Sequence, residues 1–161
     1  MKKILCSFIT IVMLTLSTIS PVNAQSSQED LIDAHSSSIT YNDDGSYFVT
    51  TVEIVSSSRT TAQTVSGTKN VHLYNSSDEL VWTHTIVGTF TLVKGVSVQC
   101  TNSTYSSTIY DDSWSLTAHD NYYSGNIAYG TATYKKKVLF ITTNTYDVNA
   151  GLKCDVNGNF S

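Results

Sequence analysis

Two pairs of adjacent aspartates are the side chains of this chain best suited to acid–base chemistry. They are Asp43–Asp44 and Asp111–Asp112. A glycosidase needs two carboxyls held about 5–10 Å apart in a cleft, whereas adjacent acids in turns more often accept backbone hydrogen bonds that shape the turn. We predict the turn-shaping role. A calcium site formed by Asp111, Asp112 and Asp120 is an alternative, since secreted β-proteins often bind calcium through loop carboxylates.

The four histidines have no spacing that is typical of a metal site. They are His35, His72, His84 and His119. His72 and His84 fall on neighbouring predicted strands and could face each other across the turn at 75–78, but a third ligand is missing. We predict polar positions on sheet faces and no metal. No nucleophile elbow, phosphate loop or dinucleotide fingerprint is present, so we predict no enzyme and no cofactor.

The first 24 residues have the three-part pattern of a secretory signal peptide. A short basic start is followed by an apolar run from Ile4 to Ile19, and small residues lead to Ala24. We predict cleavage after Ala24 and a secreted, extracellular mature protein. A retained anchor is the alternative, although the run is short against the roughly 20 apolar residues of a membrane span. The short Lys-Lys start is typical of a bacterial signal.

Export also changes the interpretation of the cysteines. Cys6 leaves with the signal peptide, so that Cys100 and Cys154 remain. Outside the cell, an even pair most simply forms a disulfide. The alternation of neighbouring residues places both cysteines on core faces of different predicted strands. Two buried free thiols are the main alternative, and a catalytic or metal-binding role would need further partners.

Net charge argues against two classes of partner. The mature chain has seven basic and thirteen acidic residues, a net charge of −6. Nucleic acids and anionic membranes attract proteins through basic patches. We therefore predict no nucleic-acid partner, and contact with a membrane only through the signal peptide during export. The basic run Lys135–Lys137 is interpreted as the end of a strand or a protected sheet edge.

Strand signals fill the mature chain from Ser37 onward. Short alternating runs are separated by turns rich in Gly, Asn, Asp and Ser. In the clearest strand, Leu80 to Val93, Gly88 predicts a bulge or bend. The small residues in Ile127 to Tyr134 predict the close approach of bulky side chains.

These patterns predict an all-β fold. We expect an antiparallel two-sheet sandwich, immunoglobulin-like, with about eight or nine strands in a single domain over 37–161. A closed barrel is the alternative. A flexible mature N-terminus is predicted over 25–36, with a helical turn at 28–34 as its only helical candidate.

Aromatic residues beside predicted turns form one candidate ligand surface. Exposed aromatic rings can stack on sugar rings, which suggests a glycan ligand. The alternative places the tryptophan in the core and the tyrosines at the surface ends of strands. The four residues are Tyr110, Trp114, Tyr122 and Tyr123.

A series of strand and turn patterns runs from about Tyr47 to Ser161. They are Ser66–Lys69, Tyr74–Ser76, Leu80–Trp82, Val87–Thr91, Val98–Thr101, Trp114–Leu116, Gly130–Lys135 and Leu152–Cys154. In this order they resemble a family of small secreted proteins from clostridia and related gut Firmicutes. The resemblance implies secretion, an all-β fold and paired cysteines. It transfers no catalytic residue, because that family has no assigned function.

The sequence therefore predicts a secreted, non-enzymatic binding or surface-interaction module. Its expected partner is a glycan or another cell-surface component. The alternatives are a secreted hydrolase, using His72 or His84 with the Asp111–Asp112 pair, and an effector or toxin that acts outside the cell.

Overall fold

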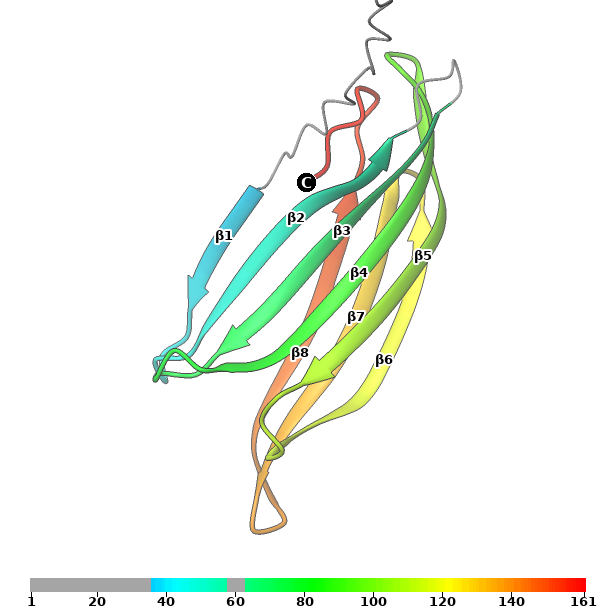
Figure 1. Cartoon of the computed structure of the whole chain (residues 1–161). Helices are drawn as coiled ribbons and strands as arrows, with labels where there is room; N and C mark the ends of the chain where they lie inside the picture. The colour runs from blue at the N-terminus through cyan, green and yellow to red at the C-terminus, as the bar shows by residue number, and fades with distance from the viewer. Residues whose placement is uncertain (1–35, 58–62) are drawn as a thin grey trace, which may run out of the picture. The chain divides into compact units, whose positions relative to one another are not determined.

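Eight β-strands form two antiparallel sheets in the computed structural model, which describes residues 36–57 and 63–161 (Figure 1). Sheet A has the strand order β1-β2-β3-β4-β5 and sheet B the order β6-β7-β8. No helix among the described residues is long and apolar enough to cross a membrane. The strands are β1 (Ser36–Tyr41), β2 (Tyr47–Ser57), β3 (Gln63–Tyr74), β4 (Leu80–Val93), β5 (Ser97–Ile109), β6 (Trp114–Ser124), β7 (Ile127–Val138) and β8 (Ile141–Lys153).

The predicted antiparallel two-sheet sandwich is confirmed, but its connections differ from those of immunoglobulin domains. Each strand pairs with the strand that precedes or follows it in the chain, whereas immunoglobulin domains use Greek-key connections. The physical reason is that short polar turns fold most strands directly back on their predecessors. The predicted signal peptide (1–24), the predicted N-terminal segment with its helical turn (25–35) and residues 58–62 lie outside the described residues.

Three of the turns share one geometry, which explains how polar segments hold the strands in register. In each, the first residue donates its N–H to the carbonyl of the fifth, at 2.8–3.0 Å. The fourth residue has a positive φ, a conformation that Gly and Asp adopt more easily than most residues. The turns are Asn42–Ser46, Asn75–Glu79 and Asp155–Asn159, and their fourth residues are Gly45, Asp78 and Gly158.

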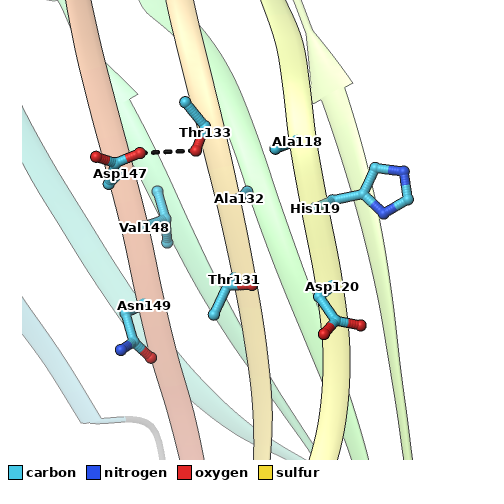
Figure 2. A pocket seen from close by; sticks show the side chains of 9 residues that line it. All are labelled: Ala118, His119, Asp120, Thr131, Ala132, Thr133, Asp147, Val148 and Asn149. Carbon is cyan, nitrogen blue, oxygen red and sulfur yellow. Dashed lines mark hydrogen bonds between the residues drawn. The ribbon is translucent and has the colours of Figure 1, made fainter.

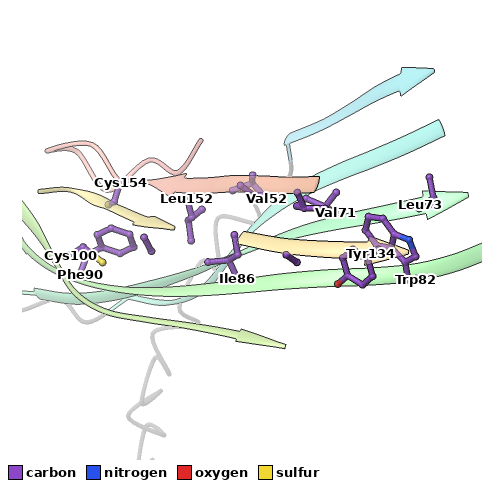
Figure 3. Close-up of a cluster of buried hydrophobic side chains, with 14 of the residues drawn as sticks. Val52, Val71, Leu73, Trp82, Ile86, Phe90, Cys100, Tyr134, Leu152 and Cys154 are labelled. Atoms are coloured by element: carbon purple, nitrogen blue, oxygen red, sulfur yellow. The ribbon is translucent and has the colours of Figure 1, made fainter. Parts of the chain in front are cut away.

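The core lies between the two sheets and is centred on β4 and β7 (Figure 3). Trp82 stacks on Tyr134 with ring centroids 4.0 Å apart and planes 6° apart. The predicted close approach to β7 is confirmed, because a Cβ on Gly130 would lie only 2.7 Å from Ile86. No bulge lies at Gly88, which pairs in register with both Gly67 and Ser103. The nearest register shift, between Thr89 and Phe90, leaves Thr101 of β5 as the extra residue, so the bulge belongs to the neighbouring strand.

Candidate functional site

Four turns lie at the same end of the sandwich, because successive strands run in opposite directions (Figure 1). We call this the turn end; it comprises 42–46, 75–79, 110–113 and 138–141. A pocket of about 210 Å³ opens here. Its lining is mostly polar and comes from both sheets: Asp44, Ser46, Leu73, Asn75, Ser76, Val81, Asp111, Trp114, Lys136, Asn144 and Tyr146.

Asp44 is the centre of a hydrogen-bond network on one side of this pocket. Its carboxylate accepts hydrogen bonds from the Ser46 amide at 3.0 Å and the Ser46 hydroxyl at 2.5 Å. The Tyr146 hydroxyl, from sheet B, donates to its other oxygen at 3.2 Å. These hydrogen bonds, those from Ser46 above all, lower the pKa of Asp44. The carboxylate thus shapes its turn, as predicted, and also ties the two sheets together.

Asp111 also lines the pocket and also shapes a turn. Its carboxylate accepts a hydrogen bond from the Ser113 amide at 2.9 Å. Burial works against ionisation, but hydrogen bonds from Ser113 and the charge of Lys136 bring the pKa of Asp111 below its usual value. The pocket therefore contains two ionised carboxylates and a lysine.

An aromatic pair forms the apolar part of the pocket. Trp114 is buried and stacks on Tyr146, with ring centroids 5.5 Å apart and planes 9° apart. The ammonium group of Lys136 lies 6.0 Å from the centre of the Trp114 ring. Such a pocket suits a small polar ligand. No histidine is among the described residues that line it, so the histidine–carboxylate pair expected of a hydrolase is not assembled here.

Beside the pocket, the β7–β8 hairpin continues beyond the rest of sheet B. β6 begins at Trp114, which pairs with Lys136, and the Ser113 carbonyl accepts the last cross-strand hydrogen bond, from the Lys137 amide at 2.8 Å. The β7–β8 pairing continues to Val138 opposite Ile141. Among the described strands, no third strand therefore supports the end of this ribbon.

The end of the ribbon is apolar and exposed to solvent. We call Val138–Ile141 the apolar tip; its four side chains are 47%, 86%, 100% and 68% exposed in chain order. Large apolar side chains are normally buried, so a contiguous exposed group of them marks an interaction site. This segment was not among the sites predicted from the sequence. The signal in the sequence is a turn made of apolar residues without Gly, Asn or Asp.

The turn at the apolar tip has an unusual backbone for its residues. Leu139 has φ 48° and Phe140 has φ 71°. A two-residue hairpin turn with two positive φ values strongly prefers Asn-Gly, because a bulky side chain clashes with its own backbone there. Strain of this kind is commonly retained at functional sites.

The predicted aromatic surface is not assembled. Trp114 is buried, as the alternative reading expected, whereas Tyr110 is exposed at the turn end. Tyr122 and Tyr123 are exposed near the other end of β6, roughly 25 Å from Trp114 at about 3.3 Å per residue. Tyr122 stacks on Tyr129, with ring centroids 4.8 Å apart. The four residues therefore form two separate groups.

The alternative in which His72 and His84 face each other is wrong. His72 pairs with Thr83, and His84 pairs with Val71, so the two imidazoles lie on opposite faces of sheet A. His72 bonds to the Thr83 hydroxyl at 2.9 Å. The register between β3 and β4 differs by one residue from the one that would pair the two histidines. A difference of one residue places a side chain on the opposite face of the sheet.

His84 is instead a core residue. It is fully buried, its Nδ1 lies 3.3 Å from the Tyr134 hydroxyl, and its Nε2 has no hydrogen-bond partner. Burial, assisted by the nearby His119, lowers the pKa of His84 to about 4. The imidazole is therefore neutral at physiological pH and is packed against aromatic rings.

The cysteines lie on core faces as predicted, but the predicted disulfide is absent from the structure. Cys100 and Cys154 are both fully buried free thiols. Each thiol donates to a backbone carbonyl, that of Asn102 at 3.2 Å and that of Asp155 at 3.5 Å. Burial, followed by the charge of Asp155 and the proximity of Cys100, raises the pKa of Cys154 to about 11. Both thiols are therefore protonated at neutral pH.

A second depression, of about 310 Å³, lies on the outer face of sheet B (Figure 2). Asp147 accepts a hydrogen bond from Thr133 at 2.7 Å, and Asp120 lies across the depression from it. The His119 ring points away from both aspartates and packs on Tyr105, with ring centroids 4.6 Å apart. The depression therefore brings no histidine to a carboxylate.

The alternative calcium site is also not assembled. Asp111 and Asp112 precede β6, and Asp120 lies in its second half. Within 36–57 and 63–161, no group of three or more His, Cys, Asp or Glu side chains is placed to hold a metal ion. Neither Asp111 nor Asp120 therefore has the neighbours that a calcium ion needs.

Comparisons with protein-family models, with curated proteins and with solved structures found no match to this chain. The resemblance to the secreted clostridial family stays a prediction, and the function is inferred from the structure of the chain itself.

Proposed function

We propose that this chain is a secreted, non-enzymatic binding module that contacts a surface outside the cell through the apolar tip. The observation that carries the proposal is the exposure of four consecutive large apolar side chains on an unsupported ribbon. Exposed apolar groups of this kind are expensive in water and are found where a protein meets a partner. The strained turn supports the same view, because folding alone would favour Asn-Gly there.

The rest of the turn end suits a contact surface better than an active site. Asp44 and Asp111 are held by turn hydrogen bonds, and Lys136 packs over Trp114. These groups are fixed by structural contacts, and no histidine of residues 36–57 and 63–161 lines their pocket. The pocket can still contribute polar contacts to a bound surface, and the exposed Tyr110 precedes Asp111 in the same turn.

Export is part of this proposal and rests on the signal peptide. Cleavage after Ala24 would leave a mature chain that begins at Gln25. Sequencing the N-terminus of the protein collected from culture medium tests this directly. A protein that starts at Met1 and stays with the cells would contradict it.

Binding to a surface can be tested with a tip variant that should fold at least as well as the natural chain. Leu139→Asn combined with Phe140→Gly removes both exposed side chains and installs the preferred turn residues. We expect at least about tenfold weaker binding to cells, cell walls or glycan arrays, given the apolar area removed. The control is Val96→Ser, which removes an apolar side chain that is 75% exposed near the other end of the sandwich. Equal binding by both variants and the natural chain would contradict the proposal.

The alternatives remain predictions that activity assays can test. A hydrolase would show turnover in a substrate screen that is abolished by Asp111→Asn, since Asp111 lies in the polar pocket. An effector or toxin would kill or alter target cells when added as purified protein. Either result would replace the binding module as the best account of the chain.

A further inference from the structure

We propose that the surface contacted by the apolar tip is a lipid bilayer with anionic headgroups. This inference rests on the proposed function and names its partner class. Along the ribbon, apolar side chains at the tip are followed by basic side chains behind it. A bilayer has the matching order with depth, an apolar interior below charged headgroups. Val138–Ile141 would enter the apolar layer, and Lys135–Lys137 would lie at the level of the phosphates.

The dimensions of the ribbon agree with this order. The chain rises by about 3.3 Å per residue in a strand, so Lys137, two residues before Leu139 at the turn, lies roughly 7 Å behind the turn. Amphipathic segments at a membrane interface bury their apolar side chains to a depth of about 5–10 Å. The tip is thus long enough to reach the acyl boundary while the lysines stay among the headgroups.

The backbone of the tip can also leave water at low cost. Polar backbone groups that enter an apolar phase must be hydrogen-bonded within the protein. The β7–β8 pairing continues to Val138 opposite Ile141, so only the two-residue turn lies beyond the last pair. A longer irregular loop would carry more unpaired backbone groups into the lipid.

Local charge selects anionic lipid although the protein as a whole is acidic. The ribbon from Lys135 to Thr145 contains three lysines and no acidic residue. Lys136 is directed to Trp114 and Asp111, which leaves Lys135 and Lys137 for headgroups. A basic residue close to an anionic membrane contributes about a fivefold gain in affinity. The aspartates of the neighbouring turn, Asp111 and Asp112, would oppose deeper approach and limit insertion to the tip.

The residues of the strained turn also favour insertion into lipid. Leu139 and Phe140 occupy positions where Asn and Gly would stabilise the hairpin. These two residues are also the most exposed of the four, at 86% and 100%. Placing the largest apolar side chains at the outermost points opposes both folding and solubility in water, but it is favourable for insertion into lipid.

The test uses the mature chain with vesicles of phosphatidylcholine alone and of phosphatidylcholine mixed with phosphatidylglycerol. We expect the natural chain to sediment with the mixed vesicles, and Leu139→Asn with Phe140→Gly to bind them at least about tenfold more weakly. Lys135→Gln with Lys137→Gln should weaken binding to the mixed vesicles by more than about tenfold and leave binding to the neutral vesicles unchanged. Val96→Ser should bind as the natural chain does. A natural chain that does not bind vesicles, or a tip variant that binds them equally, would overturn the inference.

A fluorescence measurement locates the contact on the chain. Phe140→Trp places an indole at the most exposed position, whereas Trp82 and Trp114 are buried. Emission from this variant should shift to the blue on addition of mixed vesicles, while the natural chain shows no shift. An unchanged spectrum from vesicle-bound Phe140→Trp would overturn insertion of the tip.

The outcomes separate this inference from the proposed function. Tip-dependent binding to whole cells without binding to vesicles would overturn the lipid partner and leave the binding module intact. Tip-dependent dimerisation without vesicle binding, seen by analytical ultracentrifugation, would identify a second copy as the occupant and overturn both. Vesicle binding that needs the tip and the lysines supports both.

Discussion

A two-residue hairpin turn flanks strand β7 at each end. The two turns differ in how well their residues suit the backbone and in what surrounds them. At the β6–β7 turn, Gly125 has φ 57°, a conformation that glycine adopts freely. At the β7–β8 turn, the bulky Leu139 and Phe140 adopt φ values of 48° and 71°. The first turn has residues that fit its backbone, whereas the second does not.

The surroundings of the two turns differ in the same way. The Gly125 carbonyl accepts a hydrogen bond from the Cys100 amide at 2.8 Å, and the Asn126 carbonyl accepts one from the Cys154 amide at 3.1 Å. The Asn126 side chain donates to the Cys154 carbonyl at 2.6 Å. The β6–β7 turn is thus held by both sheets. Among the placed strands, the apolar tip is held only by its own ribbon. This contrast suggests that one end of β7 secures the fold and the other is kept for contact.

The largest difference between the packed part of β7 and the apolar tip should appear on truncating an aromatic side chain. Tyr134→Ala removes a fully buried ring that stacks on Trp82 and bonds to Ser107 at 2.6 Å. We expect the free energy of unfolding to fall by about 3–5 kcal/mol. Phe140→Ala, the matched change at the apolar tip, should alter it by less than about 0.5 kcal/mol. Urea titration measures both; similar losses would show that the tip is packed in solution.

The core packed against β7 should also be sensitive to acid through His84 of β4. Its pKa is about 4 in the folded protein and about 6.5 in the unfolded chain. Between these values the unfolded chain binds a proton that the folded protein does not, so stability falls as the pH drops below 6.5 and levels off below 4. The loss should reach about 3 kcal/mol. Urea titrations at several pH values should show it in the natural chain, and the non-titrating His84→Gln should lack this component. Equal pH dependence of the two proteins would contradict it.

The thiols beside the β6–β7 turn should be inert in the folded protein. The pKa of Cys154 is raised from 9.0 to about 11, which alone makes the thiolate about 100-fold scarcer near pH 8. We expect iodoacetamide to modify neither Cys100 nor Cys154 under native conditions and to modify both in urea without a reductant, as mass spectrometry would show. If urea without reductant leaves both unmodified while urea with reductant permits modification, the cysteines are oxidised.

The smallest effects should come from the turn residues themselves, with opposite signs at the two ends of β7. Gly125→Ala places a Cβ on a residue with positive φ, where no neighbouring atom lies within 4 Å, and should destabilise the fold by about 1 kcal/mol through the backbone alone. Leu139→Asn with Phe140→Gly should stabilise it by about 1 kcal/mol. Thermal unfolding of both variants measures the contrast. A tip variant less stable than the natural chain would show that the apolar tip supports the fold.

Local patterns in the sequence were sufficient for the strands, the turns and much of the core. Alternation along Leu80 to Val93 and the polar residues of turns such as Asn42–Ser46 act over a few residues, so they can be recognised without knowledge of the whole chain. The same holds for the small residues of β7, which predicted the close packing found at Gly130.

The candidate site could not be predicted in this way, because it depends on where strands end relative to their neighbours. The apolar tip is exposed only because β6 begins at Trp114 and leaves the end of the β7–β8 ribbon unsupported. Likewise, a register that pairs His72 with Thr83 separates His72 from His84. The register between two strands is set by many weak contacts along their length. A shift of one residue moves every side chain of a strand to the opposite face of the sheet.

By itself the sequence determined an all-β chain, its polar turns and the burial of both cysteines, because alternation and turn chemistry are local properties. Only the tertiary structure decided that the connections form a meander, that the cysteines are free thiols, and that Asp44 and Asp111 line one pocket. It also decided that a protein with an acidic net charge presents a basic, apolar ribbon at Lys135–Ile141. Net charge is a sum over the chain, whereas a binding surface depends on which residues the fold leaves together and exposed.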